Sequence, residues 1–359
     1  MKVLYGIQGT GNGHLARARA LAPELLAAGI NVDFVFSGRQ RKDFFYMALF
    51  GNEYRCFEGM TFYTEKGRIQ KRKTFFNSKL VQLIKDIRSL QLTEYDLIIN
   101  DFEPISAWAA KIQNKPCLGI SHQCAFDHQV PKIKGNYLEK AIMRCFAPSQ
   151  YRIGLHWHHF NQPILPPLIE QQSIKPIKKN KILVYMGFEA LNDVISFVSG
   201  FSQYEFHVYA KVEQAEHREH VFIKPLSHSQ FHQDLSDAAG VITNAGFELA
   251  SECITLGKKL LVKPLIGQYE QICNALALQV LCRASVMDYL DQNILAKWLD
   301  IENHPPVHYP NVAQKITQWI QQGQFNEIKA LSDSLWESTD IPFQLPSTIP
   351  NKVEQNRLY

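Results

Sequence analysis

The chain has 359 residues, of which 46% are hydrophobic and 20% are charged, and its formal net charge is +4. This length predicts two domains with a full core each. The mild charge and the lack of a recognition motif argue against a nucleic-acid partner. No apolar run approaches the ~20 residues that span a membrane. Seven cysteines without a C-x-x-C pair predict free thiols and a cytoplasmic protein.

The first element is an apolar run over residues 3–8, followed by a glycine-rich turn and a helix. This pattern predicts a buried parallel strand whose loop lets a ligand approach closely. The amides that open the helix favour an anion. A dinucleotide site would need a third glycine where His14 stands, and no Gly-Lys-Ser/Thr follows to make a Walker loop. His14 is therefore a candidate catalytic group, and a helix cap is the alternative.

Helical and strand patterns alternate through the rest of the first half, as is typical of a parallel α/β sheet. Strands are predicted at 31–37, 95–100 and 116–121, and helices at 15–29, 79–91 and 105–112. Asp101 ends the second of these strands, and His122 follows the third. Ligands of open parallel sheets bind beyond the carboxyl ends of the strands, so both are candidate site residues. A helix N-cap is the alternative role for Asp101.

Residues 66–79 combine basic and aromatic side chains. They include Lys66, Arg68, Lys71, Arg72, Lys73 and Lys79, which flank Phe75 and Phe76. Such a segment is either a solvated loop or a rim that meets an anionic acceptor or an anionic membrane surface. The second interpretation predicts a protein that attaches peripherally to the inner face of the membrane.

The composition changes at 156–180, a segment that is rich in proline and has few periodic runs. We interpret this segment as a linker. His156, His158 and His159 lie at its start, but no Cys or carboxylate at ligand spacing accompanies them. A zinc site there is unsupported, and no metal site is expected in the chain.

The second half repeats the pattern of the first, because residues 181–187 echo the opening strand and its glycine. Further strands are predicted at 205–210, 240–243 and 259–263, and helices after 246, after 268, at 311–322 and at 326–336. We therefore expect an N-terminal domain at 1–155, the linker at 156–180, a C-terminal domain at 181–330 and an extended tail at 331–359. The fold class is α/β, with two Rossmann-like parallel-sheet domains that face a cleft.

Taken together, these motifs resemble the two-domain nucleotide-sugar glycosyltransferases of the GT-B type. The likeness covers about residues 1–330 and is to the bacterial N-acetylglucosaminyltransferases of peptidoglycan lipid intermediates and to plant-type UDP-sugar transferases. It rests on the glycine loop with His14, on the strand that ends at Asp101, on Gly246 and Glu252, and on residues 270–274. In plant-type enzymes an aspartate at the Asp101 position orients the loop histidine, and the glutamate at the Glu252 position holds the ribose hydroxyls.

The resemblance, with the helix amides, implies two sets of ligand contacts. We expect donor contacts from Gly187, Lys224, Asn244, Gly246, Phe247, Glu252, Glu270, Gln271 and Asn274, and acceptor contacts from Gly11, Asn12, Gly13 and His122. The chain departs from the plant-type motif at Asn244, Glu248 and Leu249. A carboxylate at Glu248 would repel a diphosphate unless it points away, and Lys224 is a candidate to replace the lost phosphate contacts.

The implied activity is transfer of a sugar from a nucleotide-sugar donor, expected to be UDP-linked, to a hydroxyl acceptor that is potentially lipid-linked. His14 would act as the base, because an imidazole accepts a proton near neutrality, and Asp101 would orient it. Backbone amides would stabilise the leaving diphosphate, so no cofactor or metal is expected. Direct displacement would invert the anomeric centre. The alternatives are a UDP-sugar epimerase that uses Asp101, Glu103 and Glu270, and a non-catalytic nucleotide-sugar binding protein.

Overall fold

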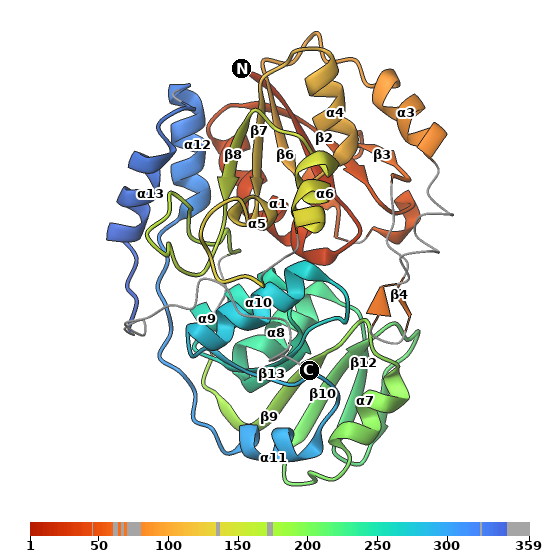
Figure 1. Ribbon diagram of the computed structural model, residues 1–359. Coiled ribbons are helices and arrows are strands. Elements are labelled where there is room, and N and C mark those ends of the chain that lie inside the picture. The colour runs from red at the N-terminus through yellow and green to blue at the C-terminus, as the bar shows by residue number, and fades with distance from the viewer. Residues whose placement is uncertain are drawn as a thin grey trace.

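A computed structural model gives the fold (Figure 1) and describes residues 1–44, 46–59, 64–65, 68–69, 80–133, 137–170, 175–323 and 325–342. Two α/β halves are stacked on each other, and each contains its own sheet. The expected α/β class with two parallel-sheet domains is therefore confirmed.

The first half contains a six-stranded sheet with the order β3-β2-β1-β6-β7-β8, and every neighbouring pair is parallel. Its strands are β1 (Lys2–Gln8), β2 (Asn31–Ser37), β3 (Arg55–Phe57), β6 (Leu97–Asp101), β7 (Cys117–Ser121) and β8 (Tyr151–Gly154). Its helices are α1 (Asn12–Ala27), α3 (Leu80–Ser89), α4 (Pro104–Ile112), α5 (His122–Ala125) and α6 (Tyr137–Phe146). The run over residues 3–7 is apolar throughout because β1 is central and both of its faces are covered.

The second half contains a seven-stranded sheet with the order β11-β12-β10-β9-β13-β14-β15, in which only β11 is antiparallel to its neighbour. Its strands are β9 (Lys178–Tyr185), β10 (Glu205–Ala210), β11 (Glu216–Arg218), β12 (Val221–Pro225), β13 (Ala238–Asn244), β14 (Lys259–Lys263) and β15 (Ala284–Val286). Its helices are α7 (Leu191–Val198), α8 (His228–Asp237), α9 (Phe247–Thr255), α10 (Tyr269–Val280) and α11 (Gln292–Leu299).

The two sheets share one topology. If the edge strand β11 is set aside, both follow the order 3-2-1-4-5-6 of the Rossmann fold. The order reverses between β1 and β6 in the first sheet and between β9 and β13 in the second. Ligands of such sheets bind in the crevice at this switch point. The helices that follow the central strands, α1 in the first half and α9 in the second, contact each other where the halves meet (Figure 1).

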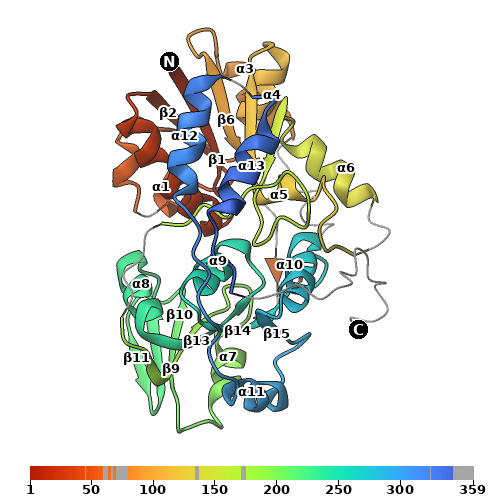
Figure 2. The same cartoon turned by 90° about the vertical axis from the view of Figure 1, so that its left-hand side faces the viewer.

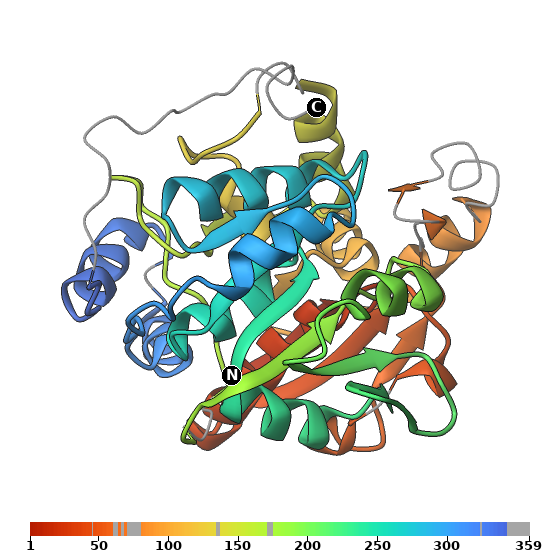
Figure 3. The ribbon, with the colours of Figure 1, turned by 90° about the horizontal axis from the view of Figure 1, so that it is seen from below.

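The C-terminal helices α12 (Val312–Gln322) and α13 (Ile328–Glu337) lie against the first half, not the second. Asn311 Nδ2 donates to Glu24 Oε1 of α1 at 2.8 Å, and Trp336 Nε1 donates to the carbonyl of Ile164 at 2.6 Å. Figure 2 shows both helices packed beside the upper half, and Figure 3 shows them outside the second half. The expected domain limits therefore need correction, because 312–322 packs with the N-terminal domain and the expected tail begins inside α13.

The expected linker is also more ordered than its composition indicates. Trp157 and Leu165 are fully buried, and the backbone of 154–165 folds back on itself through a bridge between Leu155 and Leu165. Burial lowers the pKa of His158 to about 3, and its Nδ1 accepts a hydrogen bond from the amide of Phe160 at 2.9 Å. His158 therefore serves local packing.

The basic segment lies largely outside the described residues. Within residues 66–79 the structure describes only Arg68–Ile69 (β5), which pairs antiparallel with the preceding Thr64–Glu65 (β4). The proposed basic rim therefore stays a prediction. Among the helices that the structure describes, none has the length and hydropathy needed to cross a bilayer.

Candidate active site

The switch point of the first sheet brings together the two residues that the sequence analysis paired. β1 and β6 are neighbours, with Ile7 opposite Asp101, and α1 starts just beyond β1. His14, in the first turn of α1, therefore faces the carboxyl end of β6. His14 Nδ1 lies 2.8 Å from Asp101 Oδ1. The expected contact between these side chains is confirmed, although 87 positions separate them.

The loop after β6 holds His14 from its other face. Phe102 follows Asp101 and has a φ of +55°, a left-handed conformation that is uncommon for an aromatic residue. Its ring stacks in parallel on the imidazole of His14 and also packs against Phe146. The strained backbone therefore turns an aromatic ring onto His14 at the point where the strand ends.

Arg17 is a third member of this cluster, and the sequence analysis missed it. It lies one turn after His14 on the same face of α1. Its Nε donates to Asp101 Oδ2 at 2.9 Å and its Nη2 donates to Asp101 Oδ1 at 2.8 Å. This bidentate geometry is the strong form of an arginine–carboxylate pair. The only sequence signal for it was an arginine three residues after the loop histidine.

Glu248 links this cluster to the second half. It lies in the first turn of α9, and its Oε2 accepts a hydrogen bond from Arg17 Nη1 at 2.8 Å. Gly13 makes the approach possible, since a Cβ at that position would lie 3.3 Å from Glu248 Cβ. The side chain of Glu248 thus points toward Arg17. The sequence motif had left the direction of this side chain open.

The charges of the cluster shift its pKa values in opposite directions. Burial alone would raise the pKa of Asp101, but Arg17 and His14 beside it hold that pKa below its ordinary value. Burial raises the pKa of Glu248 to about 8, against the opposing effect of Arg17. Its Oε1 is buried and has no hydrogen-bond partner among the described residues. One guanidinium therefore faces two carboxyl groups, and Glu248 is the one that keeps a proton near neutrality.

The two contacts of His14 Nδ1 correspond to different tautomers of the ring. With a proton on Nδ1, the ring donates to Asp101, and Nε2 is left as the acceptor. Arg17 Nη2 also lies 2.6 Å from Nδ1 and can donate to it only when that atom carries no proton. No described residue hydrogen bonds to Nε2, and the side chain is 13% exposed. The imidazole is thus held at one nitrogen and open at the other.

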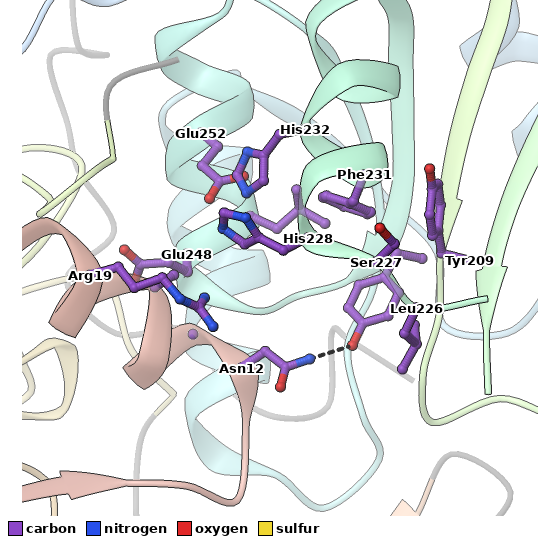
Figure 4. Close-up of a pocket in the computed structure, with 14 residues that line it drawn as sticks. Asn12, Arg19, Tyr209, Leu226, Ser227, His228, Phe231, His232, Glu248 and Glu252 are labelled. Carbon is purple, nitrogen blue, oxygen red and sulfur yellow. Dashed lines mark hydrogen bonds between the residues drawn. The ribbon is translucent and has the colours of Figure 1, made fainter. Parts of the chain in front are cut away.

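A pocket of about 130 Å³ lies between α1 and the second half (Figure 4). It is lined by Asn12, Gly13, Ala16, Arg19, Tyr185, Tyr209, Leu226, Ser227, His228, Phe231, His232, Glu248, Leu249 and Glu252. Asn12 Nδ2 donates to the hydroxyl of Tyr185 across it at 3.3 Å. Glu252, expected at the ribose, lies in this pocket. His14 does not line it, but Glu248 borders both the pocket and the His14 cluster.

The carboxyl edge of the second sheet holds the residues expected at a diphosphate. Gly187 follows β9, and Gly246 caps α9 with open space where a Cβ would stand. Asn244 at the end of β13 donates to the carbonyl of Lys263 at 3.1 Å. Lys263 Nζ pairs with Glu189 at 2.8 Å. The sequence analysis missed this ion pair, although Lys263 ends a strand that it predicted.

Two expected ligand contacts are instead contacts between the halves. His122 is fully buried, with Nε2 2.6 Å from Asn274 Oδ1 and Nδ1 2.8 Å from the carbonyl of Leu155. Its ring stacks on Phe247 at 3.9 Å between centroids. Asn274 also donates to the carbonyl of Ala245 at 3.0 Å. We therefore remove His122 and Asn274 from the set of ligand contacts, because their polar atoms are already used. Phe247 can offer a ligand only its backbone N–H.

Three further residues that were expected to contact the donor already use their polar groups in contacts within the protein. Gln271 Oε1 accepts from the amide of Leu265 at 2.8 Å, which ties down the loop before α10. Glu270 accepts from Gln123 of the first half at 3.0 Å. Lys224 pairs with Asp234 at 2.6 Å. Its ammonium group is thus already neutralised, so it is a poor replacement for lost phosphate contacts.

Comparison with known proteins agrees with this architecture. Residues 1–301 match the family model of glycosyl transferase family 1. No curated protein matches the chain. Among solved structures, the chain is similar to the glycosyltransferase VinC in complex with DTDP, at 12% identity and a TM-score of 0.54, with 94% of this chain and 98% of that chain covered.

Two further solved structures show the same fold. The chain is similar to the spinosyn rhamnosyltransferase SpnG complexed with spinosyn aglycone, at 12% identity and a TM-score of 0.55, with 94% of this chain and 100% of that chain covered. It is also similar to MurG of Acinetobacter baumannii, at 14% identity and a TM-score of 0.52, with 89% and 99% covered. The fold is the two-domain GT-B type. The match over most of the chain shows that this protein belongs to glycosyl transferase family 1 and is a glycosyltransferase.

Proposed function

We propose that the protein transfers a sugar from a nucleotide-sugar donor to a hydroxyl acceptor with inversion, and that His14 is the base. The observation that carries the proposal is the imidazole held at Nδ1 by a buried carboxylate and open at Nε2, at the switch point that faces the second half. This arrangement suits an acceptor proton that leaves through Nε2, while Asp101 stabilises the imidazolium that forms.

The nucleotide end of the donor would occupy the pocket beside Glu252, whose carboxylate would accept hydrogen bonds from the ribose hydroxyls. The base would lie against Leu226 and Ser227, which line the pocket. The diphosphate would meet the amides at Gly187 and at the start of α9, since a helix N-terminus favours negative charge. We keep the expectation that no metal takes part in this step. VinC was solved with DTDP, so the donor screen includes thymidine as well as uridine nucleotides.

Binding of a whole donor would require the halves to move apart. The pocket holds about 130 Å³, whereas sites for ligands of this size occupy about 300–1,000 Å³. The contacts that must give way include the hydrogen bond between Asn12 and Tyr185 and that between Tyr46 and Ser227. Hinge motion of this kind is common in enzymes that enclose two substrates.

The acceptor is proposed only as a hydroxyl compound. SpnG was solved with an aglycone, and a lipid-linked acceptor at an anionic membrane is the expectation that comes from the basic segment 66–79. Sedimentation with anionic liposomes separates the two cases, since each basic residue near such a surface contributes about 1 kcal/mol. Loss of sedimentation on replacing Lys71, Arg72 and Lys73 with Gln would support the membrane, and no sedimentation by the parent would exclude it.

The decisive experiment combines binding and turnover. A thermal-shift screen of nucleotides and nucleotide sugars comes first, since a ligand at 100 times its Kd stabilises by about 2.7 kcal/mol. The selected donor is then incubated with candidate acceptors, and products are followed by NMR. Transfer that depends on His14 and inverts the anomeric centre would support the proposal. Isomerisation of the donor without acceptor, or binding without turnover, would contradict it.

A further inference from the structure

A cluster of three side chains beside the pocket has the composition of a metal site. His228 and His232 lie one turn apart on α8, and Glu170 comes from the segment that joins the two sheets. His228 Nε2 is 3.0 Å from Glu170 Oε2, and His232 Nε2 is 3.9 Å from the same oxygen. The three ligand atoms all lie within 4.8 Å of one another. Figure 4 shows both imidazoles on one side of the pocket.

We propose that Glu170, His228 and His232 bind one divalent transition-metal ion, with Zn²⁺ as the best fit. Zn²⁺ binds imidazole nitrogen and carboxylate oxygen at about 2.0–2.2 Å, so neighbouring ligand atoms in a tetrahedral site lie about 3.4 Å apart. The distances of 3.0 Å and 3.9 Å bracket this value, and all three ligand atoms lie within 4.8 Å of one another, so side-chain adjustment alone can bring them onto one ion. Imidazoles four residues apart on one helix are a common zinc-binding pair.

The surroundings keep the nitrogen ligands available. His232 is partly buried, and its Nε2 faces the same carboxylate oxygen of Glu170 that His228 contacts. A neutral imidazole has the lone pair that a metal requires. The ring of Tyr46 packs on His228 at 5.2 Å between centroids and limits its rotation. The three side chains are 20–27% exposed, which leaves a path for an ion and room for water as a fourth ligand.

An ion at this site would connect the segment that joins the two sheets to helix α8 of the second half. Glu170 precedes β9, whereas α8 lies between β12 and β13. The inference does not rest on the proposed proton transfer, because none of the three residues belongs to the His14 cluster, although His228 and His232 also line the pocket. It departs from the expectation that the chain has no metal site. Without an ion, the same geometry is an ordinary ion pair between Glu170 and His228, and the experiment distinguishes these two states.

The test uses the full chain after treatment with a chelator and removal of that chelator. Zn²⁺, Co²⁺ and Mg²⁺ are titrated separately by calorimetry, and the Co²⁺ complex is also followed by its visible absorption. We expect one equivalent of Zn²⁺ and of Co²⁺ to bind with a tetrahedral Co²⁺ spectrum, and Mg²⁺ not to bind, because Mg²⁺ prefers an octahedron of oxygens. No nucleotide is present, so the outcome does not depend on the proposed donor.

The variants are Glu170→Gln, His228→Gln and His232→Gln, which keep side-chain size and hydrogen-bonding capacity. Loss of an outer-shell partner alone weakens metal binding about 10–100-fold, so each variant should lose at least as much affinity. The matched control is His217→Ala, an exposed histidine on β11 of the same half, which should bind as the parent does. Circular dichroism without metal checks that each variant is folded. Equal Zn²⁺ affinity of parent and variants, or no stoichiometric binding by the parent, would overturn the proposal.

Discussion

The two halves of this protein have the same sheet topology but different chemistry at equivalent positions. In each half a central strand leads into a glycine-containing loop at the switch point. In the first half that crevice holds the ionisable cluster of His14, Arg17 and Asp101. In the second half it holds Gly187, Gly246 and the backbone amides that open α9. The same topology thus carries groups suited to proton transfer in one crevice and groups suited to an anion in the other.

The difference also shows how the halves depend on each other. Arg17 of the first half is neutralised by Asp101 of the same half, and it also donates to the carboxyl group of Glu248 from the other half. A buried arginine needs such partners, because an uncompensated buried charge is strongly destabilising. The orientation of Asp101, and through it of His14, is therefore tied to the position of α9. The following predictions test the comparison between the halves, beginning with the largest expected effect.

Removing the imidazole should abolish most turnover without weakening donor binding. His14→Ala is expected to lower kcat by about 10²–10⁴-fold, the usual contribution of a general base. Asp101→Asn should also lower it, through the wrong tautomer. Initial-rate measurements with the selected donor, and calorimetry with its nucleotide, give the two quantities. His217→Ala serves as the control. A tenfold loss of nucleotide affinity in His14→Ala would contradict the proposal that the first half supplies the base and the second half binds the nucleotide.

Removing the shared arginine should destabilise the fold. Arg17→Met leaves Asp101 and Glu248 without their cation and is expected to cost about 3–5 kcal/mol in the free energy of unfolding. Denaturant titration measures it. Arg218→Met in the second half is the matched control, since Arg218 forms an exposed pair with Glu216, and such pairs contribute about 0–1 kcal/mol.

The double variant Arg17→Met/Glu248→Gln sharpens this test, because it also replaces one of the two carboxyl groups that lose Arg17 as a partner. We expect it to be more stable than Arg17→Met alone. Strictly additive losses would mean that Arg17 and Glu248 do not act on each other across the halves.

Replacing the carboxylate of Glu252, which lies in the pocket, should affect nucleotide binding alone. Glu252→Gln is expected to weaken nucleotide binding by about 1.5–3 kcal/mol, the usual value of a hydrogen bond to a charged group, and isothermal calorimetry measures the change. Lys224→Met is the contrasting variant, because its ammonium is already paired with Asp234, and it should bind nucleotide as the parent does. A larger loss in Lys224→Met than in Glu252→Gln would reverse these two assignments.

The last prediction concerns the pH dependence of stability. A glutamate titrates near 4.3 in an unfolded chain, whereas burial raises the pKa of Glu248 to about 8. Between these values the native protein holds a proton that the unfolded chain has lost. Its contribution to the free energy of unfolding is therefore complete below pH ~4.3 and falls as the pH rises toward 8, by at most about 1.4 kcal/mol per pH unit.

Glu248→Gln should remove this part of the pH dependence, because its amide does not titrate. Denaturant titrations of parent and variant at pH 5, 6, 7 and 8 measure the two slopes. All other titrating groups are common to both proteins and cancel in the difference. Parallel curves would show that Glu248 keeps an ordinary pKa.

The sequence by itself determined the α/β class, the repeated strand-and-helix pattern and the positions of His14 and Asp101. These follow from local signals, because a central parallel strand must be apolar on both faces. The carboxyl ends of neighbouring parallel strands also share one edge, so a loop histidine and a strand-end aspartate could be paired without coordinates. Helix α8, which supplies His228 and His232, carried too few apolar residues for any element to be predicted there.

Only the tertiary structure decided which polar side chains meet across the halves. Arg17 has the spacing of any helical arginine, and its partner Glu248 comes from 231 positions away. His122 was predicted as a ligand contact because it follows a strand, and Asn274 because residues 270–274 resemble a donor-sugar motif, yet the two bond to each other. The helices α12 and α13 return to the first half for a similar reason. Periodicity shows which face of an element is buried, but the element that covers it is chosen by long-range packing.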